Sequence, residues 1–281
     1  MACHSTVMLL LLLVLPASHA ADSYDACTGT IDSLPTTIGT PGTWCLKANL
    51  STDLGVGAAI TINANNVTLD CNGFRIGGLA AGNQTFAVGV RAVDRFNVVV
   101  RRCVIRGFSN GIDLFGAPTG GHVVEDNRLD QMTTRGILVG GSGCLVQRNQ
   151  VTDTGGRPDS GVSTGLSVPC SGARILDNQV NGVTVTGQNG EGTVLGIVLG
   201  NHTVASGNLV TDLVPAGSGE AFGISLLTDQ HCAIRDNHVF NDMVDGVGIQ
   251  ANLNCFCSGN RISGYPIGIN PCFDAGGNFN N

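Results

Sequence analysis

Hydrophobic strands recur along this chain with an Asn and a Gly at fixed places. Residues Val123 to Gly141 hold one complete copy: a buried strand, an Asn, a second short strand, a turn, and a strand that begins Gly-Ile. The Asn recurs at Asn127, Asn149, Asn178, Asn208, Asn237 and Asn260, with spacings of 22, 29, 30, 29 and 23. The Gly-led strand recurs at Gly111, Gly136, Gly165, Gly196, Gly223 and Gly246. A variable period of this length predicts a β-solenoid.

The two ends of the chain depart from the repeat. Alternating apolar and polar residues begin near residue 59, as in half-buried strands. Residues 22–54 lack the pattern and contain Trp44, the single Trp. We expect a cap there because the first coil of a solenoid exposes its apolar end and its strand edges. The predicted division is an N-terminal cap at 21–58, a β-helix at 59–272 and a C-terminal tail at 273–281.

The first coils carry a family resemblance. ITINANNVTLDCNGFRI (60–76) followed by NVVVRRCVIRGFSNGIDL (97–114) resembles pectin-lyase-like right-handed parallel β-helix proteins, and most of all the exported parallel-β-helix-repeat group. The resemblance covers about residues 59–272. It implies an all-β fold: a right-handed solenoid of about eight coils with three parallel sheets, and a cap that contains a disulfide. Many relatives act on acidic polysaccharides, but the fold also has non-catalytic members.

The N-terminus and the cysteines indicate export. The apolar run VMLLLLLVL (7–15) is followed by small residues, which predicts a signal peptide at 1–20 and a secreted or periplasmic protein. Cys3 lies in that segment, which leaves ten of the 11 cysteines for disulfides. Stacked or similar positions make candidates of Cys27, Cys45, Cys71, Cys103, Cys232 and Cys255. A metal cluster at Cys255-Phe256-Cys257 is the alternative, although no further ligands follow at zinc spacing.

Composition narrows the partners. A net charge of -7 with a single Lys argues against nucleic acid, and no later segment is apolar enough to span a membrane. We expect a monomer whose partner, if any, is a glycan.

Loop lengths indicate the best candidate site. The spacing from Asn to the following Gly is 9 residues after Asn127 but 16, 18 and 15 after the next three repeats, so three coils bulge at one corner. Stacked bulges form a wall beside the Gly-strand sheet. Their carboxylates can serve as general acid and base, or hold Ca²⁺ while an arginine faces a uronate or abstracts a proton. We assign catalysis to Asp159, Glu191 and Arg157, and substrate binding to Asp153, Asp212 and Glu220.

A second polar group lies on the outward positions of the Gly-led strands. That row is mostly small or apolar, and only Arg91 and Asp113 form a polar pair on adjacent coils, so we add both to the substrate-binding residues. The Asn column is interpreted as structural, because stacked amides can bond to the copies on either side.

Function stays open between two classes. The leading interpretation is an exported protein that interacts with carbohydrate and, if catalytic, cleaves an acidic polysaccharide as a lyase or a glycoside hydrolase. No cofactor or metal is assigned, and Ca²⁺ is the candidate. The alternative is a non-catalytic structural or surface-recognition solenoid, because the motifs of polygalacturonases and mannuronan epimerases are absent.

Overall fold

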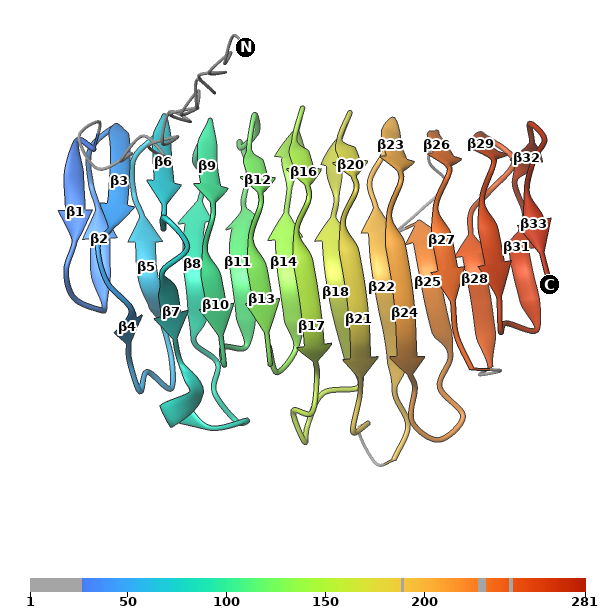
Figure 1. Cartoon of the computed structure of the whole chain (residues 1–281), viewed down its shortest axis with the longest axis horizontal. Coiled ribbons are helices and arrows are strands. Elements are labelled where there is room, and N and C mark those ends of the chain that lie inside the picture. Colours follow the sequence, from blue (N-terminus) through green and yellow to red (C-terminus); the bar gives the residue numbers. More distant parts are fainter. Residues whose placement is uncertain (1–26, 188–189, 227–230, 243–244) are drawn as a thin grey trace, which may run out of the picture.

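The structure, a computed structural model, describes residues 27–187, 190–226, 231–242 and 245–281. The predicted signal peptide lies outside these residues. The described chain winds into a parallel β-helix whose coils stack into a rod (Figure 1). The predicted fold class, a right-handed β-helix with three parallel sheets, is confirmed.

Three sheets run the length of the rod. Sheet 1 comprises β1 (Gly29–Ile31), β3 (Gly42–Leu46), β6 (Val67–Asp70), β9 (Val98–Arg101), β12 (Val123–Glu125), β16 (Leu145–Gln147), β20 (Arg174–Leu176), β23 (Thr203–Ser206), β26 (Cys232–Arg235), β29 (Cys255–Ser258) and β32 (Phe273–Asp274). Sheet 2 comprises β2 (Thr36–Ile38), β5 (Ala58–Ile62), β8 (Val88–Val93), β11 (Asn110–Phe115), β14 (Arg135–Val139), β18 (Val162–Val168), β22 (Thr193–Leu199), β25 (Ala221–Leu226), β28 (Gly246–Gln250) and β31 (Ile267–Asn270). Sheet 3 comprises β4 (Leu50–Ser51), β7 (Arg75–Gly77), β10 (Val104–Arg106), β13 (Arg128–Asp130), β17 (Gln150–Thr154), β21 (Gln179–Thr184), β24 (Leu209–Val214), β27 (His238–Phe240), β30 (Arg261–Ser263) and β33 (Phe279–Asn280).

Smaller elements complete the described chain. A short pair of strands, β15 (Gly141–Ser142) and β19 (Cys170–Ser171), lies outside the three sheets, and a 3₁₀ turn, η2 (Leu79–Ala81), leads from sheet 3 to sheet 2. Strands β1 to β4, from the predicted cap, already pair with strands of the three sheets.

Aliphatic residues stacked along the axis form the core. On sheet 2, one inward row aligns the following residues across neighbouring coils: Ile60, Val90, Ile112, Ile137, Leu166, Ile197, Ile224 and Ile249. Each of them is fully buried. Like residues repeat at the strand separation of about 4.8 Å, so each coil buries the apolar face of the next.

The Asn column is a buried hydrogen-bonded ladder. Asn178 shows the pattern: its Nδ2 donates to Val146 O at 2.9 Å and to Asn208 Oδ1 at 3.0 Å. Its own Oδ1 accepts from the backbone N and from Nδ2 of Asn149, both at 3.0 Å. The structural interpretation of the column is therefore confirmed, and Asn278 extends the ladder by one coil beyond Asn260.

Five disulfides are present among the described residues. They join Cys27–Cys45, Cys71–Cys103, Cys144–Cys170, Cys232–Cys255 and Cys257–Cys272. All six candidate cysteines are therefore bonded. The alternative of a metal cluster at Cys255-Phe256-Cys257 is wrong, because each of these two sulfurs is used in a disulfide. The Cys144–Cys170 bond was not foreseen, since Cys170 lies on the extra strand β19.

One predicted register is shifted by two residues. The sequence pattern aligned Gly246 with Gly223, but Ile224 pairs with Ile249, so Gly248 takes that place. Because side chains alternate with a period of two, the shift keeps each residue on its face. The outward residue opposite Ser225 is therefore Gln250, and Asn270 follows it in the next coil.

Candidate functional site

The three long loops lie at one corner, between sheet 3 and sheet 2, as their spacing predicted (Figure 1). Much of their extra length forms additional strand. Thr154, Val183 and Leu213 pair across β17, β21 and β24, and all three are fully buried. The corner is therefore a paired extension of the sheets, with short loops at its rim.

Two glycines direct the first rim loop. Gly155 has φ +124°, and a Cβ there would lie 1.8 Å from Thr184 O, so no other residue fits. Gly156 follows with φ +81°. This turn leads the chain into residues 157–161, which reach toward η2.

Arg157 is a buried clamp at this rim. Its Nε donates to Asp159 Oδ1 at 2.5 Å and its Nη2 donates to Oδ2 at 3.2 Å. Its Nη1 donates to Thr85 O at 3.4 Å, and its guanidinium carbon lies 3.5 Å from the centroid of the Phe86 ring. Arg157 is 8% exposed. These contacts hold the guanidinium between two loops.

The two predicted catalytic carboxylates lie in different settings. Asp159 faces solvent, and the hydrogen bond from Arg157 lowers the pKa of its carboxyl. Glu191 Oε2 accepts from the hydroxyl and the backbone N of Ser218, at 2.5 and 2.6 Å, and these bonds lower its pKa. Both groups are ionised at neutral pH, whereas a general acid requires the opposite shift. Among the described residues, no hydrogen bond or ion pair joins Asp159 to Glu191.

The remaining rim carboxylates are spread along the corner. Asp212 accepts a short hydrogen bond from Asn181 Nδ2. Glu220 is exposed and lines a shallow pocket of about 350 Å³ with Asp245. Asp153 is exposed and lines a pocket of about 370 Å³ beside Gly155.

The outward face of sheet 2 brings Arg91 and Asp113 together. The register of β8 and β11 places the two residues opposite each other, as the sequence predicted. Burial raises the pKa of the Asp113 carboxyl above its ordinary value. Smaller, opposing influences come from Arg91, Asn110 and Arg135. Asp113 is thus a half-buried carboxylate that faces positive charge.

Arg135 was missed from the sequence. It pairs with Asn110 across β14 and β11, one coil beyond Asp113. Burial lowers its pKa, opposed by Asp113, and its Nε is buried without a hydrogen bond to any described residue. A sequence signal for Arg135 exists, namely its place directly before a repeat Gly. Asn110, Arg135 and Thr164 occupy that outward position in successive coils.

Beyond this charged group, the outward row of sheet 2 is largely buried. Ser167, Val198 and Ser225 continue the row of Asp113 and Leu138, and they are 9%, 3% and 7% exposed. The charged and more exposed part of the outward face therefore lies at Arg91, Asp113 and Arg135.

The described residues contain no group of three or more His, Cys, Asp or Glu side chains arranged to hold a metal ion. Ca²⁺ therefore stays a prediction. Within the same residues, no helix is long and apolar enough to cross a membrane.

Comparison with known proteins gives likeness at the level of fold. No family model matches the sequence, and no curated protein matches it. Among solved structures, the chain is similar to the catalytic domain of a GH87 alpha-1,3-glucanase in complex with nigerose, with 12% identity, a TM-score of 0.42, and coverage of 90% of this chain and 63% of that chain.

Two further solved structures are similar to the same extent. The tailspike protein of E. coli bacteriophage HK620, in complex with a pentasaccharide, has 13% identity and a TM-score of 0.48 over 92% of this chain and 61% of its own. The Agl-KA catalytic domain has 10% identity and a TM-score of 0.45 over 91% of this chain and 61% of its own. This chain spans less than two thirds of the length of these proteins. The likeness is one of fold, the right-handed parallel β-helix.

Proposed function

We propose that this protein is an exported glycan-binding β-helix protein that holds an acidic polysaccharide along the outward face of sheet 2. The observation that carries the proposal is the placement of Arg91 and Arg135 in the coils on either side of Asp113. Five disulfides in the described chain support an oxidising compartment.

The charged group suits an acidic sugar. A guanidinium binds a carboxylate with two parallel hydrogen bonds, and two guanidinium groups outweigh the single charge of Asp113. Asp113 can accept hydrogen bonds from sugar hydroxyls. Sheet 2 runs the length of the rod, so a linear polymer that binds at the charged group can extend along its outward face.

Cleavage of the polysaccharide by Asp159, Glu191 and Arg157 is the second candidate. Cleavage is less well supported than binding, because the guanidinium of Arg157 is already bound to Asp159 and the pKa of each of the two carboxyls is lowered. Asp113 lies on the outward face of sheet 2, and the pKa of its carboxyl is raised. That is the direction that a general acid requires.

A panel of acidic and neutral polysaccharides tests the proposal. Binding of the purified mature protein is measured by calorimetry, and release of reducing ends is measured in the same samples with and without Ca²⁺. We expect saturable binding to at least one acidic polymer and weaker binding to a neutral polymer of the same length. Absence of binding across the panel would support the alternative of a structural solenoid. Release of reducing ends would make the protein an enzyme.

A further inference from the structure

Two loops meet across the corner of the rod and form what we call the clasp, residues 79–86 and 155–161. The coils between them turn the same corner with short connections at 107–109 and 131–134. Asn83 Nδ2 donates to Gly156 O at 3.4 Å, and Arg157 Nη1 donates to Thr85 O at the same distance. The clasp therefore spans two coils, and a space remains beneath it.

That space is a pocket of about 370 Å³. Its lining consists of Leu79, Gly82, Asn83, Gly107, Gln131, Thr133, Asp153, Gly155 and Gly156. The polar groups are a carboxylate, two amides and a hydroxyl. Together they can accept hydrogen bonds from the hydroxyl groups of a sugar ring and donate hydrogen bonds to them. The glycines leave the backbone accessible, and Leu79 offers an apolar surface.

The wall of this pocket contains polar side chains without partners. Thr133 lines the pocket, and its buried Oγ1 forms no hydrogen bond with any described residue. Ser163 Oγ is also buried without a partner, and a Cβ on Gly155 would lie 3.1 Å from it, so it stands behind the wall. Buried polar groups are normally hydrogen-bonded, so a small rearrangement of this wall on binding would let Thr133 gain a bond.

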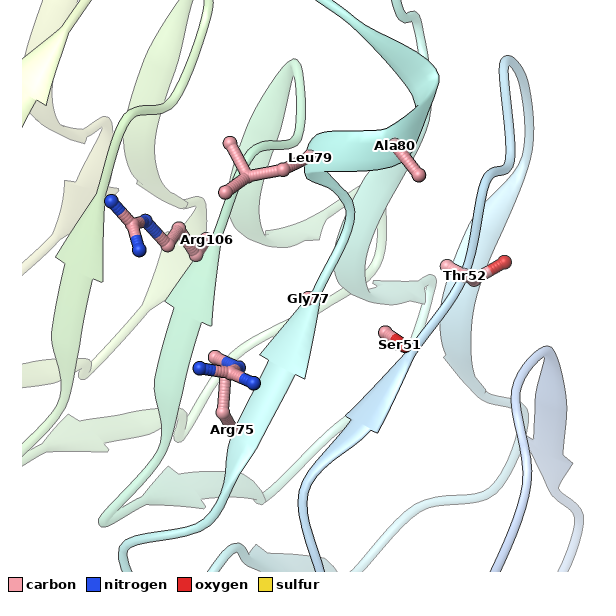
Figure 2. A pocket seen from close by; sticks show the side chains of 7 residues that line it. All are labelled: Ser51, Thr52, Arg75, Gly77, Leu79, Ala80 and Arg106. Atoms are coloured by element: carbon pink, nitrogen blue, oxygen red, sulfur yellow. The ribbon is translucent and has the colours of Figure 1, made fainter.

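A second pocket of about 230 Å³ lies on the other side of Leu79 (Figure 2). It results from Gly77, which stands in register between Ser51 and Arg106 and leaves a gap in that row. Arg75, two residues before Gly77 on the same face, extends its guanidinium beside the gap (Figure 2). In the described structure no hydrogen bond or ion pair occupies that guanidinium.

The other walls of the second pocket are less polar. Leu79 and Ala80 stand above the gap (Figure 2). Arg106 contributes mainly its aliphatic stem, because its Nε is bound to Asp130 Oδ2 at 2.8 Å and to Gln131 Oε1 at 3.0 Å. An apolar surface beside one available guanidinium suits a ring that presents C–H groups and a carboxylate.

We propose that the two pockets form a second binding site, which takes a short segment of an acidic oligosaccharide. One sugar residue lies beneath the clasp, with its hydroxyls at Asp153, Gln131 and Thr133. The neighbouring residue crosses Leu79 and directs its carboxylate to Arg75. This site lies at the corner between sheet 3 and sheet 2 and shares no lining residue with the charged group of Arg91, Asp113 and Arg135.

Calorimetry with trigalacturonate and with its methyl ester tests the site. The ester keeps the size of the ligand and removes its charge. Arg75→Gln is expected to weaken trigalacturonate binding about tenfold, the worth of one charge-assisted hydrogen bond. It leaves binding of the ester nearly unchanged. The side chain of Arg75 is exposed, and the hydrogen bond to Asn49 comes from the backbone N of Arg75, which the substitution keeps. The variant should therefore fold normally.

Gly77→Val tests the same site by filling it. A Cβ at Gly77 would lie 3.5 Å from Ser51 Cβ, an ordinary contact, and φ is not in the positive range, so the strand tolerates a side chain. This variant should weaken binding of both ligands. Arg128→Gln is the matched control, because Arg128 lies in the same outward row as Arg75, two coils away and outside both pockets.

Three results would overturn the inference: unchanged affinity in Arg75→Gln and Gly77→Val, an equal loss in Arg128→Gln, or no binding of either ligand to a folded wild-type protein. Failure of the sheet 2 proposal is distinguishable, because Arg91→Gln changes the outward face of sheet 2 and none of the residues that line the two corner pockets.

Discussion

The guanidinium of Arg157 lies 3.5 Å from the centre of the Phe86 ring, and this contact joins two loops that leave the rod in different coils. The pair closes the clasp over the corner pocket. Arg157 is also the arginine that the sequence pattern favoured for catalysis, and this contact engages its guanidinium. The loop lengths located the corner, and the contact shows what holds the side chain of Arg157 there; its catalytic role stays a prediction.

Loss of this contact should open the clasp. Arg157→Ala and Phe86→Ala should each lower the free energy of unfolding, and a double-mutant cycle should give a coupling of about 0.5–2 kcal/mol, the range for a partly desolvated cation–π pair. Chemical denaturation measures the cycle. Arg128→Ala paired with Phe86→Ala is the control, and a coupling there equal to that of Arg157 would refute the specific contact.

The Asn ladder should be a main source of stability. Asn178→Ala removes a side chain that bonds to Asn149, Val146 and Asn208, and leaves several buried groups without partners. We expect a loss of about 3 kcal/mol or more in the free energy of unfolding. Gln179→Ala, at the exposed neighbour, should cost well under 1 kcal/mol. Equal losses at both positions would argue against the ladder.

His122 should make the fold sensitive to mild acid. It is fully buried and its Nδ1 accepts from Val98 N at 3.3 Å. The Thr119 hydroxyl donates to Arg95 O, so the 2.6 Å contact with His122 Nε2 requires the proton on Nε2. Burial lowers the pKa of His122 from 6.5 to about 4, and protonation of Nδ1 would also lose the bond that this atom accepts from Val98.

Between these two pKa values the unfolded chain binds a proton that the folded chain does not. The free energy of unfolding should therefore fall as pH decreases from 6.5 toward 4, by up to about 3 kcal/mol in total. Denaturation between pH 7.5 and 5.5 measures the slope before most carboxylates titrate. His122→Gln should flatten it, whereas His238→Gln, at an exposed position, should not. A slope that His122→Gln leaves unchanged would assign the effect to other groups.

Asp113 should lower the stability of the folded protein while it takes part in glycan binding. Because burial raises its pKa, its ionised form costs the folded state free energy at neutral pH. Asp113→Asn should therefore leave the melting temperature unchanged or raise it, and it should strengthen binding of an acidic polysaccharide because a negative charge is removed. A clear drop in melting temperature would show that the attraction of Arg91 and Arg135 outweighs the burial.

The repeat itself made the fold predictable. Asn127 and its equivalents mark the turn where an amide bonds to the next coil, and Gly111 and its equivalents mark where a coil leaves no room for Cβ, since a Cβ at Gly111 would lie 2.8 Å from Gly136 O. The slip between Gly246 and Gly248 arose because two glycines stand two residues apart. A period of two gives both the same face, so the pattern alone could not choose.

The site was less predictable, because its contacts join segments whose spacing carries no period. Phe86 lies in a loop outside the three long bulges, and nothing in the repeat relates it to Arg157. Arg135 was visible as an outward residue before a Gly, but its closeness to Asp113 depends on the local bulge that turns Asn110 and Asp113 to one face.

One comparison of affinities tests the central proposal most directly. It measures how tightly the wild-type protein and the double variant Arg91→Gln, Arg135→Gln bind the acidic polysaccharide with the highest affinity. We predict a loss of about tenfold or more in the double variant, with an unchanged melting temperature within a few degrees, and no loss in Arg128→Gln. Equal affinity for the wild type and the double variant would contradict the assignment of the outward face of sheet 2 as the glycan-binding surface.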